Sequence, residues 1–136
     1  MITRRASVLG AAAATALSVI SATAFASSYL RRAWLLLDGS RRDRKMVRAR
    51  RDDRELLLVV HRVATARALS GRRMKVSKLA AAAHPHLLLV LENCERAYAA
   101  GLRGDGQKFV EHIERARSED LTFRAIIERL GLRLPR

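Results

Sequence analysis

Two apolar patterns near the C-terminus constrain the fold of this chain more than any other feature of its sequence. In each pattern the residues recur at alternating steps of three and four, which places them along one face of an α-helix and fits no β-strand. Between the patterns, Gly101 suits a left-handed helix end and Asp105 suits the N-cap of a following helix. We therefore predict a helical hairpin over residues 85–130. Its inward faces consist of Leu87, Leu91, Cys94 and Tyr98 in the first helix and of Phe109, Ile113, Ala116, Asp120, Phe123, Ile127 and Leu130 in the second.

Asp120 is the one charged residue on the inward face of the second predicted helix, so it needs a partner if that face is buried. Residues that face each other in an antiparallel hairpin have position numbers with a nearly constant sum, and this register makes His84 and His86 the nearest polar side chains. One interpretation is a metal site of two histidines and one carboxylate, formed by His84, His86 and Asp120. A second is a hydrogen bond that orients the start of the hairpin. A helix break near Ser118 would instead leave Asp120 exposed.

The same register brings Cys94 near His112, which suggests a thiol–imidazole pair. Cys94 lies on the apolar face, however, where a cysteine commonly behaves as a small hydrophobic residue. Because it is the only cysteine, no intramolecular disulfide can form. The chain also has no glycine-rich phosphate loop, nucleophile elbow, CxxC or HExxH motif. We therefore predict no catalytic residues and no cofactor.

The positive charge is concentrated in one part of the chain. The 27 Lys and Arg residues exceed the 13 Asp and Glu residues by 14. Residues 31–73 carry 14 basic and 5 acidic side chains, whereas residues 74–136 carry 11 and 8. This excess favours an anionic partner, either lipid headgroups or nucleic acid. With no aromatic residue between Leu35 and Tyr98, nucleic-acid binding here would be electrostatic and unspecific. The candidate anion-binding residues are Arg41, Arg42, Arg44, Lys45, Arg48, Arg50, Arg51 and Arg54.

The basic part also has helical periodicity. Asp38-Gly39-Ser40 predicts a break, after which residues 42–70 predict one helix. Further on, Ser77 suits the N-cap of a short helix, and Pro85 suits the first turn of the next one. The inward face predicted for residues 42–70 consists of Met46, Ala49, Asp53, Leu56, Val60 and Val63, widened by Leu57, Ala64 and Ala68.

The N-terminus has the pattern of an export signal. Arg4 and Arg5 precede an uncharged run from residue 6 to 26, and Ala24 and Ala26 are the small residues that a signal peptidase requires. Thr3, Arg4 and Arg5 resemble the start of the bacterial twin-arginine export signal. The sequence departs from that motif at Ser7, where the family prefers phenylalanine. The resemblance covers residues 1–26 and implies export of a folded protein to the periplasm or cell envelope.

A permanent inner-membrane anchor is the competing interpretation. Residues 6–30 contain no charged side chain, and about 20 apolar residues can span a bilayer. The flank after this run is far more basic than the flank before it, and the positive-inside rule would then keep the C-terminal part in the cytoplasm. The sequence leaves both interpretations open.

Together these features predict an all-α protein. A signal or anchor helix (1–26) is followed by a basic helical segment (27–73) and by a domain that contains the hairpin (74–136). The predicted function is that of a non-enzymatic adaptor or binding module in the cell envelope. The alternative is an electrostatic binder of nucleic acid or anionic lipid through residues 41–54. The expected partners are an anionic membrane surface, another protein, nucleic acid and the export machinery.

Overall fold

The computed structural model describes the backbone of residues 2–136 and the side chains of residues 24–136. Within this range the chain forms helices and no strand, which confirms the all-α prediction. The elements are α1 (Ile2–Ala49), α2 (Arg54–Arg73), the 3-10 turn η1 (Lys78–Ala80), α3 (His84–Leu102) and α4 (Gly106–Arg129). Arg4 and Arg5 of the predicted signal, and residues 6–23 of the predicted anchor, lie outside the residues whose side chains are described.

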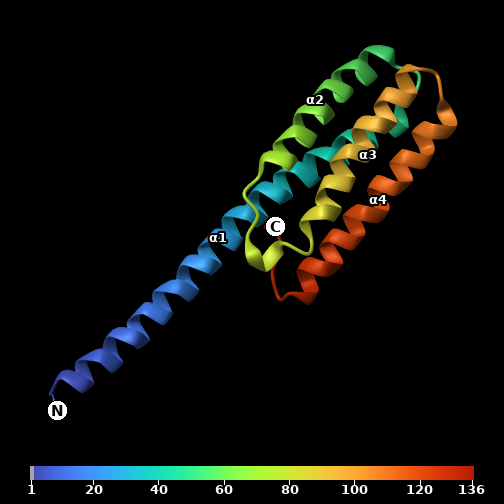
Figure 1. The fold of residues 1–136 in the computed structure, drawn as a ribbon. Coiled ribbons are helices and arrows are strands. Elements are labelled where there is room, and N and C mark those ends of the chain that lie inside the picture. The colour runs from blue at the N-terminus through green and yellow to red at the C-terminus, as the bar shows by residue number, and fades with distance from the viewer. Residues whose placement is uncertain (1) are drawn as a thin grey trace.

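The helices form a bundle in which α3 is the central member (Figure 1). It packs along α4 on one side and along α2 on the other, and the C-terminal part of α1 runs alongside α2 and α3. One hydrophobic core joins all four helices, and its largest members include Tyr29 of α1, Leu91 and Tyr98 of α3, and Phe123 of α4. The segments 27–73 and 74–136 therefore share a core.

The structure confirms the predicted hairpin, which is formed by α3 and α4. Every predicted inward residue is buried except Leu130, which is 45% exposed because it follows the last residue of α4. Asp105 caps α4, since its carboxylate accepts a hydrogen bond from the amide of Lys108 at 3.0 Å. The prediction for Gly101 is wrong: α3 continues through it to Leu102, and the left-handed residue is Gly104, with φ of 76°.

The predicted break at residues 38–40 is also wrong, because α1 passes through it without interruption. Gly39 instead makes room for a neighbouring helix: a Cβ atom at this position would lie 2.6 Å from the guanidinium of Arg67 on α2. The guanidinium of Arg67 therefore occupies the space that a side chain at position 39 would take.

The chain turns after residue 49, so residues 42–70 do not form one helix. Asp53 caps α2 by accepting a hydrogen bond from the amide of Leu56 at 3.0 Å. Because the helix is interrupted, Met46 and Val63 do not share an inward face, and they are 41% and 37% exposed. The buried face of α2 consists of Leu57, Val60, Ala64, Ala68 and Gly71. Ser77 is the N-cap of η1 and Pro85 lies in the first turn of α3, and both positions confirm the predictions.

Candidate functional site

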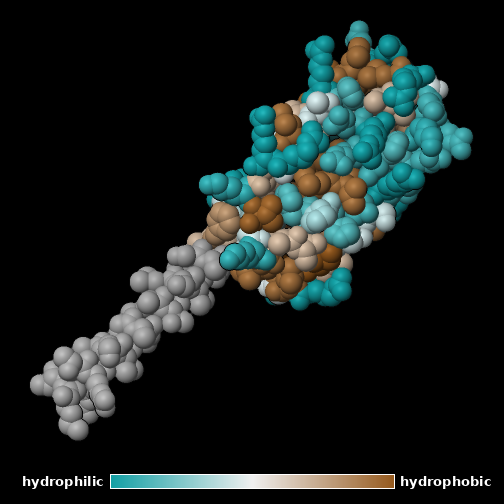
Figure 2. Space-filling model, viewed as in Figure 1, coloured by the Kyte–Doolittle hydropathy of each residue, from teal (hydrophilic) through white to brown (hydrophobic). Residues whose placement is uncertain are grey.

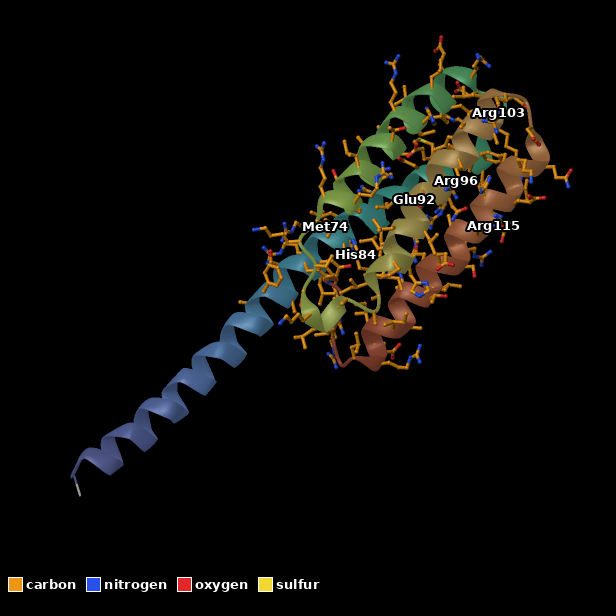
Figure 3. The ribbon with its side chains drawn as sticks, viewed as in Figure 1. Met74, His84, Glu92, Arg96, Arg103 and Arg115 are labelled. Carbon is orange, nitrogen blue, oxygen red and sulfur yellow. The ribbon has the colours of Figure 1, made fainter. Side chains whose placement is uncertain are left out.

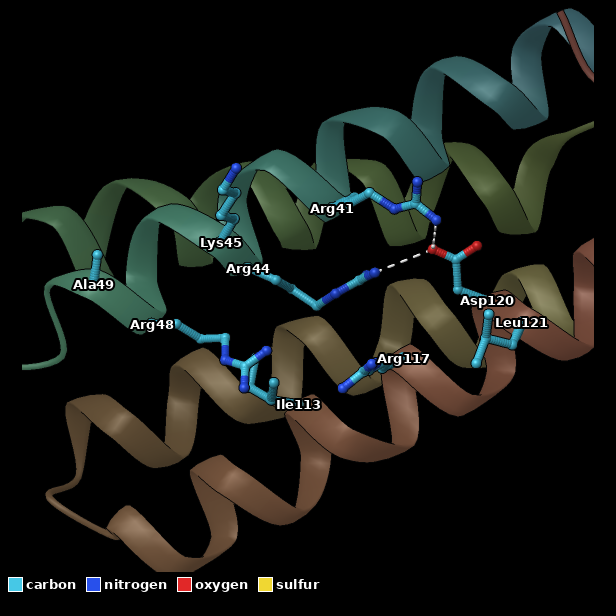
Figure 4. A pocket seen from close by; sticks show the side chains of 9 residues that line it. All are labelled: Arg41, Arg44, Lys45, Arg48, Ala49, Ile113, Arg117, Asp120 and Leu121. Atoms are coloured by element: carbon cyan, nitrogen blue, oxygen red, sulfur yellow. Dashed lines mark hydrogen bonds and ion pairs between the residues drawn. The ribbon is translucent and has the colours of Figure 1, made fainter. Parts of the chain in front are cut away.

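A buried ion pair joins α1 to α4. Asp120 is 2% exposed and Arg44 is 7% exposed. Nη2 of Arg44 donates to Oδ2 of Asp120 at 3.1 Å, and Nε of Arg124, one turn further along α4, donates to Oδ1 at 2.7 Å. Nη2 of Arg41 lies 3.7 Å from the same Oδ2 (Figure 4). Three arginines therefore offset the cost of removing this carboxylate from water.

The position of Arg44 follows from the periodicity of α1. Leu37, Ser40, Arg44 and Val47 are all buried, and they are separated by steps of three, four and three. Arg44 is thus the charged member of the inward face of α1, as Asp120 is of α4. The sequence interpretation grouped Arg44 with its exposed basic neighbours, although this spacing was available to place it inside the bundle.

Arg44 also contacts the buried cysteine. Its Nη1 lies 3.6 Å from Sγ of Cys94. Burial raises the pKa of the Cys94 thiol, and the nearby Arg44 guanidinium only partly opposes that rise. The predicted thiol–imidazole pair is not formed, because Nδ1 of His112 lies 3.0 Å from the side-chain oxygen of Asn93. Cys94 is therefore a protonated residue of the core at neutral pH.

A groove of about 700 Å³ lies above the ion pair, between α1 and α4. We call it the basic groove; its lining residues are Arg41, Arg44, Lys45, Arg48, Ala49, Ile113, Arg117, Asp120 and Leu121. Arg48 from α1 and Arg117 from α4 reach into the space between the two helices (Figure 4). The lining carries five positive side chains and one carboxylate, and that carboxylate is already neutralised by Arg44.

The predicted anion-binding residues do not all lie on one surface. Arg41, Arg44, Lys45 and Arg48 line the basic groove, whereas the other four lie elsewhere. Arg42 pairs with Asp38 at 3.0 Å, and Arg50 is exposed at the end of α1. The guanidinium of Arg51 lies over the Phe109 ring, 5.8 Å from its centroid, and Arg54 donates to the carbonyl of Leu102 at 3.1 Å. Arg117 of α4 was missed, because sequence alone does not show that α1 and α4 are neighbours.

The structure does not bring the predicted metal ligands together. Nδ1 of His84 lies 2.8 Å from the hydroxyl of Tyr29, and Nδ1 of His86 lies 2.6 Å from the carboxylate of Glu119. Asp120 instead pairs with Arg44 and Arg41 of α1 and with Arg124 of α4, so its predicted pairing with His84 or His86 is wrong. The side chains described contain no group of three or more histidine, cysteine or acidic residues that could hold a metal ion.

His84 lies at the start of α3, close to the end of α2 (Figure 3). Burial lowers the pKa of His84, and a backbone hydrogen bond with Gly71 only partly opposes this effect. Burial also raises the pKa of the Tyr29 hydroxyl. The neutral forms of both side chains are therefore favoured in the folded protein.

Comparisons of this chain with protein-family models, with curated proteins and with solved structures found no match. Among the residues whose side chains are described, no helix combines the length and the apolar character that crossing a membrane requires.

Proposed function

We propose that the protein is a non-enzymatic helical binding module that holds phosphate-bearing anions in the basic groove. The observation that carries this proposal is that four exposed basic side chains line one groove whose carboxylate is already paired; they are Arg41, Lys45, Arg48 and Arg117. All four side chains are exposed, so a ligand can reach them without unfolding the bundle. Arginine favours phosphate because its planar guanidinium can donate two parallel hydrogen bonds to phosphate oxygens.

The shape of the groove favours an extended ligand. Arg41 and Arg48 are seven positions apart on α1, so their Cα atoms are separated by roughly 10 Å along the helix axis. Two or three linked phosphate groups would place a negative charge near each cation over this length. Ala49, Ile113 and Leu121 supply apolar surface beside the cations, where the uncharged part of a ligand can lie.

Direct binding tests this proposal. The full chain is titrated with inorganic tripolyphosphate in a calorimeter, and the Arg41→Gln, Lys45→Gln, Arg48→Gln triple variant is compared with wild type. Because three charge-assisted contacts are lost, we expect affinity to fall by at least about tenfold. The control is the triple variant Arg62→Gln, Arg73→Gln, Lys75→Gln, which removes the same charge from exposed positions outside the groove.

The control should bind within about twofold of wild type, since it keeps every groove cation. Equal losses in the two variants would mean that net charge alone attracts the anion, and would overturn the proposal. Binding of single-stranded DNA with no binding of tripolyphosphate would instead support the nucleic-acid alternative for residues 41–54.

We also propose that residues 1–26 direct export, on the strength of the paired Arg4 and Arg5 and the small residues Ala24 and Ala26. Among residues 24–26, Ala26 alone is buried, so cleavage after it would keep the core contacts from Tyr29 onward. Replacing Arg4 and Arg5 by lysine in a fusion to a fluorescent protein should abolish export. A fusion that stays membrane-bound and faces the cytoplasm in both versions would contradict this proposal and favour the anchor.

A further inference from the structure

The outer face of α2 is unusually apolar for a surface helix in a highly charged protein. Four of its large aliphatic side chains are between 37% and 59% exposed, and Ala66 lies among them. Those four are Leu58, Val59, Val63 and Leu69. The opposite face of the same helix is buried in the core, so this apolar surface is not needed to hold α2 in the bundle. Contiguous exposed apolar surface of this kind commonly marks an interaction site.

Basic residues border and interrupt this apolar face. Arg54, Arg62 and Arg73 are exposed on α2, and Lys75 and Lys78 are exposed just beyond its end. Glu55 is the single acidic residue of the helix. On the face shown in Figure 2, apolar side chains (brown) lie beside hydrophilic ones (teal) along the edge that α2 forms (Figures 1 and 2). Apolar side chains beside arginine and lysine are typical of helices that lie in the surface of an anionic membrane.

We infer that the outer face of α2 docks on an anionic lipid bilayer, with Leu58, Val59, Val63 and Leu69 entering the headgroup region. The positive charge around this face favours an anionic bilayer over a second copy of the chain. A second copy of the chain would bring the same arginines and the same excess of positive charge to the contact, whereas anionic headgroups neutralise them. The surface is also distinct from the basic groove, because that groove lies between α1 and α4 and contains no residue of α2.

A fluorescent label on α2 tests this inference independently of the N-terminal segment. The full chain carries Ala66→Cys labelled with a polarity-sensitive dye, while the native Cys94 stays buried and unlabelled. The control label is placed at Ser118→Cys, an exposed position on α4. On vesicles of phosphatidylglycerol and phosphatidylcholine, the Ala66 label should shift to shorter wavelength and be quenched by a lipid-bound quencher. The Ser118 label should not respond, and neither label should respond to pure phosphatidylcholine.

Equal responses of the two labels, or no response of either, would overturn the inference. A shift of the Ala66 label that depends on protein concentration without vesicles would assign this face to a second copy, and would also overturn it.

Substitution of the apolar residues gives a second readout. The triple variant Leu58→Gln, Val59→Gln, Leu69→Gln should bind anionic vesicles through α2 more than about tenfold more weakly, as measured by quenching of the Ala66 label. The matched control replaces three residues outside α2 by glutamine: Leu35, Val110 and Leu130, which are exposed to a similar extent. This control should keep the quenching of the Ala66 label. If the two triple variants lose the response equally, α2 has no special role. Binding of tripolyphosphate should be unchanged in both variants, because none of the substituted residues lines the basic groove. A failure of membrane docking by α2 can therefore be distinguished from a failure of anion binding in the groove.

Discussion

At the scale of single residues, the buried ion pair of Arg44 with Asp120 links α1 to α4 and contributes to the stability of the bundle. Removing Asp120 leaves Arg44 buried without its carboxylate, which costs about 3–5 kcal/mol. We therefore expect Asp120→Asn to lower the free energy of unfolding by that amount in urea titrations. Arg44→Gln should cost less than Asp120→Asn but more than about 1 kcal/mol, because Asp120 loses a buried partner and keeps its hydrogen bond from Arg124. The double variant Arg44→Met, Asp120→Leu should recover most of the loss, because apolar side chains need no charged partner.

The exposed pair of Arg42 with Asp38 is the matched control, since the side chain of Arg42 is 75% exposed. Arg42→Gln should cost less than about 1 kcal/mol, because water and salt screen an exposed pair. Equal costs for Arg42→Gln and Arg44→Gln would show that the Arg44–Asp120 pair is not buried in solution.

His84 gives the stability of the bundle a defined dependence on pH. Burial lowers its pKa below the ordinary value of 6.5, so the unfolded chain binds a proton more readily than the folded chain does. The free energy of unfolding should therefore fall as the pH falls through 6.5 towards the folded pKa. Burial and the charges of Arg115, Arg96 and Lys108 lower the pKa of His112, which acts in the same direction.

Melting temperatures measured between about pH 5 and pH 8 check this dependence, since these pH values bracket the titration of histidine. His84→Gln should flatten the curve in this range, because glutamine does not titrate. A wild-type protein that is more stable at pH 5 than at pH 8 would contradict the assignment.

At the scale of helices, the turn between α1 and α2 depends on the cap at Asp53. Its carboxylate satisfies the amide of Leu56, so Asp53→Ala should destabilise the protein by about 1 kcal/mol. Asp52 has the same charge, is exposed, and lies one residue earlier, outside α2. Asp52→Ala should therefore change stability by less than about 0.5 kcal/mol. Equal effects of the two substitutions in urea titrations would mean that charge, not the cap, stabilises the start of α2.

The helices of the hairpin could be predicted because their signals are local. The spacing of Leu87, Leu91, Phe109 and Ile113 reflects one helix face in each case, and Asp105 acts as a cap on its own helix. Contacts between distant helices could not be read in the same way. A glycine predicts a break unless a neighbouring side chain needs the space, and Gly39 is such a case because Arg67 packs against it.

The candidate site shows the same division between local and long-range information. Arg41, Lys45 and Arg48 were recognised from the charge of their own segment. Arg117 lies on a helix with mixed charge, and it lines the groove only because the fold places α1 and α4 on opposite sides of it. For the same reason, Asp120 was paired with the histidines that are close to it in the hairpin, and the arginines of α1 were overlooked.

At the scale of the whole molecule, the positive charge is divided between two surfaces. The basic groove concentrates cations between α1 and α4, and the outer face of α2 combines cations with aliphatic side chains. Binding of tripolyphosphate at the groove should weaken steeply with salt, because its contacts there are between charged groups. The affinity of α2 for an anionic bilayer should fall only partly with salt, since its aliphatic side chains contribute to binding independently of charge.

The most direct test of the central claim is to map the bound anion onto the chain by NMR. Tripolyphosphate is added to the ¹⁵N-labelled protein, and the shifts of backbone amide signals are followed during the titration. We expect saturable shifts concentrated in residues 41–49 of α1 and residues 113–121 of α4, because these segments line the groove. Signals of α2 should stay in place. Shifts spread evenly over the basic surface, or concentrated outside α1 and α4, would contradict the proposal that this groove is the anion-binding site.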